Sequence, residues 1–243
     1  KHIRRNAELR MYALWIVVLV AFVTWIMTRE GLFTSLGGLM QNGLSTVVSA
    51  ATTCGMQAVY PEQIGGTITD GVVILVIVAI LFGACAYSSG GGIKFVRILQ
   101  VLRWIKYSIL VRLAPDNARV RIKYEHFGSQ SLSSEDAMVA MTVFILYLGT
   151  AALGSMAFIA YGNDALNSVF EAISYVTNCG MTTEITQAGL PFGLKVVALL
   201  LMWAGRVEFI ALIAAIVGII ISIHPENLFS NDRSRELRTL KSK

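Results

Sequence analysis

Charged residues and prolines are scarce in this 243-residue sequence. Asp, Glu, Lys and Arg make up 14% of it, and there are four prolines, whereas an ordinary soluble domain is about 25% charged. Hydrophobic residues account for 55% of the chain. So little charge in so apolar a sequence argues against a soluble domain and favours an integral membrane protein.

Cysteine and histidine are also rare, with three residues of each. An odd number of cysteines without a Cys-x-x-Cys pair argues against a disulfide framework, and no cluster of His or acidic residues surrounds them as a metal site would require. The sequence has no phosphate-binding loop, no nucleophile with a partnered base and no Gly-x-Ser-x-Gly turn. We therefore expect neither an enzyme nor a directly bound cofactor.

Basic residues flank the long apolar runs instead of forming a basic domain, so the formal charge of +5 does not indicate nucleic-acid binding. They concentrate before Met11, in the polar stretch Lys106–Ser134 and in the tail from Pro225. Short basic segments of membrane proteins stay in the cytoplasm. We therefore expect the N-terminus, the middle loop and the C-terminus to be cytoplasmic, where their bases can contact anionic lipid.

Three segments have the length and low charge of membrane-crossing helices, namely Met11–Met27, Ala137–Tyr161 and Val196–Ile223. Two further segments, Leu32–Ala51 and one that ends at Val176, each stop at a polar strip. If these two also crossed the membrane, the basic loops would no longer share one side. We therefore predict that they dip into the membrane and return.

The two polar strips are copies of one another. Thr52–Met56 reads Thr-Thr-Cys-Gly-Met, and Thr177–Met181 reads Thr-Asn-Cys-Gly-Met, 125 positions later. In a membrane, non-helical backbone persists only where protein or water satisfies its polar groups, and carbonyl oxygens in such a strip can replace the hydration shell of a cation. The alternative is a pair of tight turns in a protein that conducts nothing.

The spans and strips predict two repeats of helix, half-helix, strip and helix, which divide the chain into residues 1–125 and 126–243. The second helix of the first repeat is interrupted, because Gly83–Gly92 separates the apolar Gly71–Phe82 from Ile93–Ile105 and contains three consecutive glycines. Broken membrane helices often mark a transport site. We expect a flexible gating loop here, or else small residues packed closely against a neighbouring helix.

The strips, the stretch Gly83–Lys94 (Gly-Ala-Cys-Ala-Tyr-Ser-Ser-Gly-Gly-Gly-Ile-Lys) and Gly205–Glu208 (Gly-Arg-Val-Glu) resemble the Trk/Ktr potassium-transporter family over nearly the whole chain. The resemblance implies an all-α integral membrane fold of repeated helix–pore loop–helix units, like those of potassium channels, with a broken helix in the first unit. Family members have four such units around one pore. The two units in this sequence resemble the third and fourth, and the implied function is potassium uptake.

The resemblance also assigns roles to particular residues. Backbone carbonyls would form a K⁺ filter at ten strip positions: Thr52, Thr53, Cys54, Gly55, Met56, Thr177, Asn178, Cys179, Gly180 and Met181. The implied gating residues are Gly83, Ser88, Ser89, Gly90, Gly91, Gly92, Lys94 and Arg206. Arg206 would form an electrostatic barrier or hold the loop; the alternative is an ion pair with Glu171 or Glu208. Glu171 would attract cations at the pore mouth or cap local structure.

Partners follow from the same resemblance. A missing N-terminal half or a second chain would complete the pore, and full-length subunits would form a homodimer. A cytosolic nucleotide-binding ring of the Trk system would regulate the pore, so any nucleotide belongs to that partner. The expected location is the inner (plasma) membrane of the cell, crossed several times. Two other functions stay open: a less selective transporter of Na⁺ and K⁺, and a membrane scaffold that transports nothing.

Overall fold

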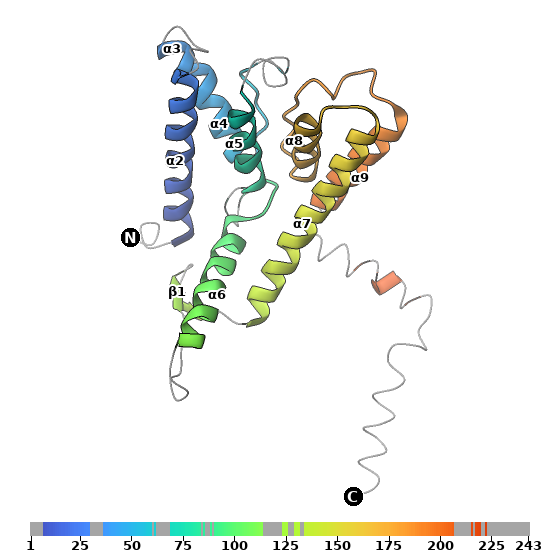
Figure 1. Ribbon diagram of the computed structural model, residues 1–243. Coiled ribbons are helices and arrows are strands. Elements are labelled where there is room, and N and C mark those ends of the chain that lie inside the picture. The colour runs from blue at the N-terminus through green and yellow to red at the C-terminus, as the bar shows by residue number, and fades with distance from the viewer. Residues whose placement is uncertain are drawn as a thin grey trace, which may run out of the picture. The chain divides into compact units, whose positions relative to one another are not determined.

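The computed structural model describes residues 7–29, 36–59, 61, 69–83, 85, 88, 90–113, 123–125, 129–131 and 134–206, together with 215, 217–219 and 222. Residues 1–206 belong to one compact unit, and the description below concerns the described part of that unit. Within it, two groups of helices follow one another along the chain (Figure 1). They are called the first and second repeat.

The first repeat begins with a long helix and returns through a short one. Its elements are α2 (Ala7–Arg29), the continuous turns α3 (Leu36–Gly38), η1 (Leu39–Leu44) and α4 (Ser45–Ala51), then α5 (Asp70–Leu81) and α6 (Phe95–Leu113). The element η1 is a π-helical turn, a feature that often accompanies functional sites. With 12 residues, α5 is about 18 Å long and reaches across only part of an apolar bilayer core of about 30 Å.

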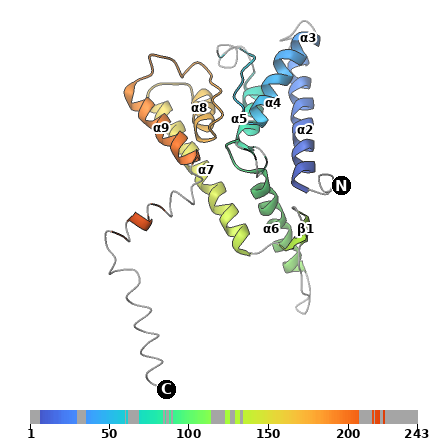
Figure 2. The ribbon, with the colours of Figure 1, turned by 180° about the vertical axis from the view of Figure 1, so that it is seen from behind.

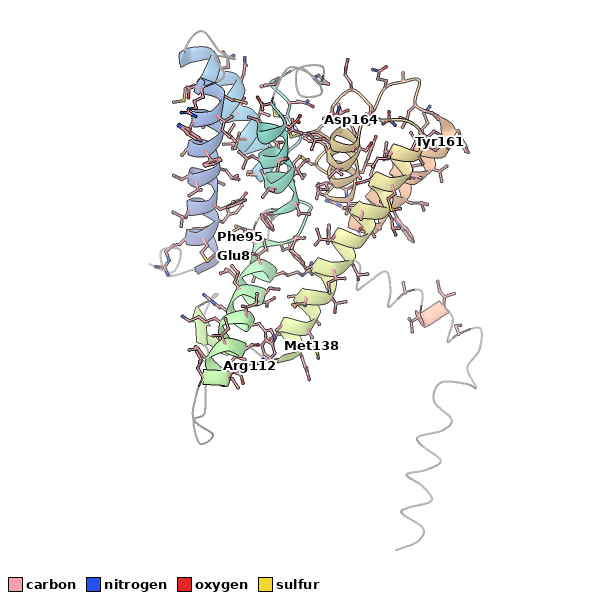
Figure 3. All side chains as sticks on the ribbon, in the orientation of Figure 1. Glu8, Phe95, Arg112, Met138, Tyr161 and Asp164 are labelled. Atoms are coloured by element: carbon pink, nitrogen blue, oxygen red, sulfur yellow. The ribbon has the colours of Figure 1, made fainter. Side chains whose placement is uncertain are left out.

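The second repeat follows the same order, with α7 (Ser134–Ala160), α8 (Ala165–Val176) and α9 (Phe192–Arg206). The side chain of Asp164 caps α8, since it accepts hydrogen bonds from the backbone N–H groups of Leu166 (3.1 Å) and Asn167 (3.3 Å). Figure 3 shows Asp164 close to Tyr161, at the turn between α7 and α8. The corresponding helical stretch of the first repeat contains the π turn.

The fold is helical as predicted, apart from one short hairpin that the sequence did not predict. Strands β1 (Lys123–Glu125) and β2 (Ser129–Ser131) pair antiparallel in the middle loop, with Lys123 opposite Ser131. The other regular elements of the described chain are helices. These strands are short and polar, so they lack the alternation of apolar and polar residues by which a sequence indicates a strand.

Most helix bounds agree with the sequence predictions, and the helix interruption between α5 and α6 lies where the glycine run predicts it. However, α6 continues to Leu113 beyond the predicted end at Ile105, because Lys and Arg are good helix formers and no proline occurs before Pro115. Helix α9 begins directly after Pro191, a residue type suited to a helix start. Its predicted continuation to Ile223 lies largely outside the described residues.

Two described helices are long and apolar enough to cross a membrane, over Glu8–Arg29 in α2 and Glu135–Ala160 in α7. Both carry large apolar side chains on their outward faces, such as Leu14 on α2 and Leu153 on α7, which are 63% and 69% exposed. A helix with apolar residues on its outer as well as its inner face suits a lipid environment better than water.

The buried core joins the two repeats. Helix α5 contacts α4 and α2 of its own repeat and α8 of the second repeat, and the views from both sides show it between them (Figures 1 and 2). Val76 and Ile80 of α5 and Phe170 and Ile173 of α8 belong to one apolar cluster. The short helices that carry the strips, α4 and α8, therefore both pack against α5.

Helix α2 is tied to the end of α4 and to the start of α6. The hydroxyl of Tyr12 donates a hydrogen bond to the carbonyl of Ala51 (3.0 Å), and its ring lies edge-on to Phe95 at 5.5 Å between centroids. Figure 3 shows Phe95 near Glu8 at this end of α2. These contacts fix the helix end from which the first strip departs.

Candidate functional site

The first strip, Thr52–Met56, leaves α4 through a defined helix ending. The N–H of Cys54 bonds to the carbonyl of Ser49 (2.9 Å), and that of Thr53 bonds to the carbonyl of Ala50 (3.0 Å). This pair of bonds is a Schellman motif, which places the residue after the helix in the left-handed region. Thr53 occupies that position with a φ of 51°.

The second strip, Thr177–Met181, reproduces these contacts 125 positions later. The N–H of Cys179 bonds to the carbonyl of Ser174 (3.0 Å), and that of Asn178 bonds to the carbonyl of Tyr175 (3.0 Å). Asn178 has a φ of 53°, and its side-chain amide donates to the carbonyl of Met202 on α9 (3.1 Å). The sequence repeat is therefore also a repeat of backbone conformation.

Each strip then passes through a glycine that needs its conformational freedom. Gly55 has a φ of 78° and Gly180 a φ of 87°, a region in which a Cβ is costly. The strips are non-helical here, so the helix ladder does not fix the direction of their carbonyl groups. Carbonyl oxygens are hard ligands of the kind that suits alkali-metal cations.

The two strips meet backbone to backbone. A Cβ on Gly55 would overlap the carbonyl oxygen of Cys179, so a peptide group of the second strip lies directly on this glycine. Just beyond, the side-chain amide of Gln57 donates to the carbonyl of Thr182 (2.8 Å) and accepts from its N–H (3.2 Å). The structure thus brings the two strips into contact at Gly55 and Cys179, and it joins the residues that directly follow them, Gln57 and Thr182.

The strips are covered unequally. Cys179 and Met181 of the second strip are 5% and 1% exposed, whereas Met56 of the first strip is 74% exposed and Cys54 is also exposed. A cavity of about 470 Å³ lies along the uncovered side, and its lining includes Cys54, Met56 and Gln57. Cys179 and Met181 belong to the buried apolar core, and no described residue covers Cys54 and Met56 to the same degree.

The loop between α5 and α6 leaves and returns at nearly the same point, since the N–H of Ile93 bonds to the carbonyl of Leu81 (3.1 Å). Lys94 donates from Nζ to the carbonyl of Ser88 (3.0 Å), and the N–H of Gly90 donates to the Ser88 hydroxyl (3.3 Å). Lys94 therefore holds the predicted gating loop from within.

Glycines bring this loop against the second strip. A Cβ on Gly83 would overlap the carbonyl oxygen of Gly91, and a Cβ on Gly91 would overlap that of Thr177. Gly92 follows with a φ of 77°. The described loop glycines thus serve close backbone packing as well as chain reversal, while Ser89 lies outside the described residues.

Helix α9 approaches the C-terminal end of α8, which is Val176. A Cβ on Gly205 would overlap the carbonyl oxygen of Val176, and the hydroxyl of Tyr147 donates to the carbonyl of Gly205 (3.0 Å). Arg206 is the next residue, at the end of α9, and is exposed. Glu208, one of the two ion-pair partners that the sequence suggested for Arg206, lies outside the described residues.

Glu171 on α8 is 1% exposed and binds the loop that follows the second strip. Its Oε1 accepts from the N–H of Thr183 (2.8 Å) and from the hydroxyl of Thr182, and its Oε2 accepts from the hydroxyl of Thr186 (2.7 Å). This arrangement differs from the ion pair with Arg206 that the sequence allowed. These hydrogen bonds are of the kind that the local structural role predicted for Glu171 requires.

Sequence reasoning missed Gln57 and the loop threonines. A charged residue is costly in an apolar membrane segment and therefore indicates a specific role, which is why the sequence identified Glu171. Gln57 lies directly after a strip, but its partner is 125 residues away, and no local pattern indicates such a contact.

No family model matches the sequence, but individual relatives do. The chain is 30% identical to an uncharacterized cation transporter of Methanocaldococcus jannaschii over 169 residues, which are 70% of this chain and 34% of the relative. It is 26% identical to the Trk system potassium uptake protein TrkH of Salmonella typhimurium and of Escherichia coli over 183 residues, 72% of this chain and 35% of each relative. The chain thus spans about a third of the length of the curated relatives it matches.

The fold also has a solved counterpart. The crystal structure of the potassium transporter TrkH from Vibrio parahaemolyticus matches with a TM-score of 0.71 and 23% sequence identity, over 86% of this chain and 44% of that one. The helical fold described above is therefore shared with a solved transporter.

Proposed function

We propose that this chain, a homologue of the Trk system potassium uptake proteins over most of its own length, forms one side of a potassium path across the plasma membrane. The carbonyl oxygens of its two strips would line that path and replace water around the ion. The cation is the transported substrate, held by backbone alone.

The observation that carries this proposal is the meeting of two strips with one backbone conformation. Thr53 and Asn178 share a left-handed φ, as do Gly55 and Gly180, and Gly55 lies against the Cys179 carbonyl. Two turns with purely structural roles would have no reason to face one another. A cation path needs this arrangement, because oxygens from several segments must converge on one ion.

The uncovered first strip supports a larger assembly. Cys54 and Met56 are exposed where their counterparts Cys179 and Met181 are buried, and exposed backbone polar groups are costly in hydrocarbon. Further units of the same kind, on the same chain or a second one, would cover this side, the present units being the third and fourth. Full-length subunits would pair as a homodimer and bind a cytosolic nucleotide-binding regulatory ring. The basic segments would lie on the cytoplasmic side of the membrane, where they contact lipid.

The loop between α5 and α6 would act as the gate. Gly91 lies against the carbonyl of Thr177, so the loop packs against the first residue of the second strip. Lys94 holds the loop through its hydrogen bond to the Ser88 carbonyl. Movement of the loop would uncover that carbonyl. Arg206, on the α9 end beside Val176, would add positive charge near the same exit and raise the barrier to cations.

Flux of ⁸⁶Rb⁺ into proteoliposomes tests the proposal. The chain assembled with the units that complete the pore should carry rubidium, and the same assembly with Gly180→Ser should lose flux or selectivity. Absence of flux in the complete assembly would leave the membrane scaffold as the better interpretation. Unchanged flux and selectivity in Gly180→Ser would remove the filter assignment.

A less selective path for Na⁺ and K⁺ is the second candidate. It is favoured by the difference between Thr53 and Asn178 at otherwise matching strip positions, which makes the two walls of the path unequal. Competition of Na⁺ with ⁸⁶Rb⁺ distinguishes the two candidates, because a potassium path ignores a large excess of Na⁺ and a less selective one does not.

A further inference from the structure

Gln57 joins the two repeats through an unusual pair of hydrogen bonds. Its side-chain amide both donates to the carbonyl of Thr182 (2.8 Å) and accepts from the N–H of the same residue (3.2 Å). This is the bonding pattern of two paired backbone segments, supplied here by a side chain. It fixes both the distance and the orientation of the Thr182 peptide groups relative to the first strip.

Thr182 is also held from behind. Its hydroxyl donates to Oε1 of Glu171, which in addition accepts from the N–H of Thr183 at 2.8 Å, while Oε2 accepts from the hydroxyl of Thr186 at 2.7 Å. A buried carboxylate is stable only when such donors satisfy its oxygens. The segment after the second strip is therefore fastened to α8 at three residues, Thr182, Thr183 and Thr186.

The described residues of the first repeat show no such fastening. The residue that corresponds to Glu171 is Thr46, whose hydroxyl bonds back to the carbonyl of Asn42 on its own helix (2.6 Å). The residue that corresponds to Thr182 is Gln57 itself. The order of attachment is thus α8, then the segment at Thr182, then the first strip.

We propose that Gln57 and Glu171 are positioning residues that set the spacing of the two strips at one end of the cation path, and thereby its preference among alkali-metal cations. The inference rests on the proposed function. Alkali-metal cations differ mainly in radius, and the positions and number of the coordinating oxygens bear on the discrimination between them. Gln57 adjoins Met56 and Thr182 adjoins Met181, so a change at either residue is transmitted directly to a strip.

This role differs from electrostatic attraction by the Glu171 carboxylate. Glu171→Gln removes the charge but keeps an oxygen for Thr182 and Thr183 and an amide for the Thr186 hydroxyl. Glu171→Ala removes charge and hydrogen bonds together. A positioning role predicts that the uptake ratio of Rb⁺ to Na⁺ stays near the wild-type value in Glu171→Gln and falls in Glu171→Ala. Equal losses of uptake rate in both variants, with an unchanged ratio, would mean attraction by charge and would overturn the proposal.

Variants of Gln57 provide a second test that does not depend on a buried carboxylate. Gln57→Ala removes both hydrogen bonds, and Gln57→Glu keeps the acceptor but places an oxygen against the Thr182 carbonyl. Both should lower the Rb⁺ to Na⁺ ratio about three- to tenfold, the scale of one or two neutral hydrogen bonds. Gln187→Ala and Gln187→Glu, on an exposed position of the same connection, are the matched controls and should leave the ratio unchanged.

The measurement is uptake of ⁸⁶Rb⁺ and ²²Na⁺ by the complete assembly in proteoliposomes, normalised to reconstituted protein. The double variant Gln57→Ala/Glu171→Ala should shift the ratio no further than the stronger single variant, because both residues act through Thr182. Wild-type flux with an unchanged ratio in Gln57→Ala overturns this inference alone. No wild-type flux overturns the proposed function and this inference with it.

Discussion

Ser49 and Ser174 occupy equivalent positions in the two repeats, but only Ser174 uses its hydroxyl to hold a strip. Ser174 donates to the carbonyl of Met181 at 2.6 Å, whereas the buried hydroxyl of Ser49 has no hydrogen-bond partner among the described residues. Met56, the counterpart of Met181, is largely exposed. The uncovered strip therefore lacks the anchor that fixes the covered one.

The two serines should respond differently to truncation. Ser174→Ala leaves the carbonyl of Met181 without its donor and should destabilise the protein by about 1–3 kcal/mol. Ser49→Ala removes an unpaired buried hydroxyl and should be neutral or slightly stabilising. Thermal unfolding of the purified protein in detergent measures both, and equal destabilisation by the two substitutions would contradict the difference in bonding.

Alanine at the two strip glycines should also have unequal effects. Both glycines have a positive φ, so each substitution carries a similar conformational cost of about 1–2 kcal/mol. Only at Gly55 would the added Cβ also overlap a neighbour, the Cys179 carbonyl, because nothing lies within 4 Å of the Cβ position at Gly180. In this chain Gly55→Ala should therefore lower the unfolding temperature more than Gly180→Ala, and the reverse order would show that the strips do not meet as described.

Exchanging the residues at the helix endings tests the strain in the first strip. A β-branched residue is a genuine outlier at positive φ, and Thr53 holds a φ of 51° where the second repeat has Asn178. Thr53→Asn should stabilise the protein by about 1 kcal/mol, and Asn178→Thr should destabilise it by at least as much, since it also loses the bond to Met202. The midpoints of chemical unfolding in detergent report both changes; a destabilising Thr53→Asn would count against strain at this position.

The gating loop offers a test through function. Gly91→Ala would force the loop away from the Thr177 carbonyl, so the complete assembly should leak ⁸⁶Rb⁺ under conditions in which the wild type is closed. The control is Gly149→Ala on α7, where nothing lies within 4 Å of the added Cβ and a helix gains up to about 1 kcal/mol. Passive efflux from loaded proteoliposomes compares them. If the Gly91→Ala variant does not leak ⁸⁶Rb⁺ and unfolds no earlier than the wild type, the contact between Gly91 and Thr177 has no role in gating.

Several features of the fold were predictable because their causes are local. The matching residues of the two strips directly indicate the repeat. A run of glycines disfavours helix wherever it occurs, so the interruption between α5 and α6 was also predictable. The extension of α6 to Leu113 was not predicted, because polarity alone does not end a helix. The hairpin at Lys123–Glu125 and Ser129–Ser131 was missed because short polar strands carry little sequence pattern.

The candidate site was less predictable, because its asymmetry comes from contacts between repeats. Nearly identical letters in the strips conceal that Cys179 is buried and Cys54 exposed. The same holds for Gly55 and Gly180, whose surroundings differ although their backbone angles agree. Which copy of a repeated motif is covered depends on its neighbour in space, and a linear sequence does not contain that information in local form.

The junction between the strips has a direction. The earlier copy supplies a bare glycine and an amide side chain, Gly55 and Gln57, and the later copy supplies the backbone that receives them. A contact of this kind, between two different surfaces of similar units, is head-to-tail, and repeated head-to-tail contacts arrange units around a ring in one direction. Thr182 stands where Gln57 would be needed for a contact with the next unit. The second repeat therefore cannot offer that next unit the side-chain bridge that the first repeat offers to it.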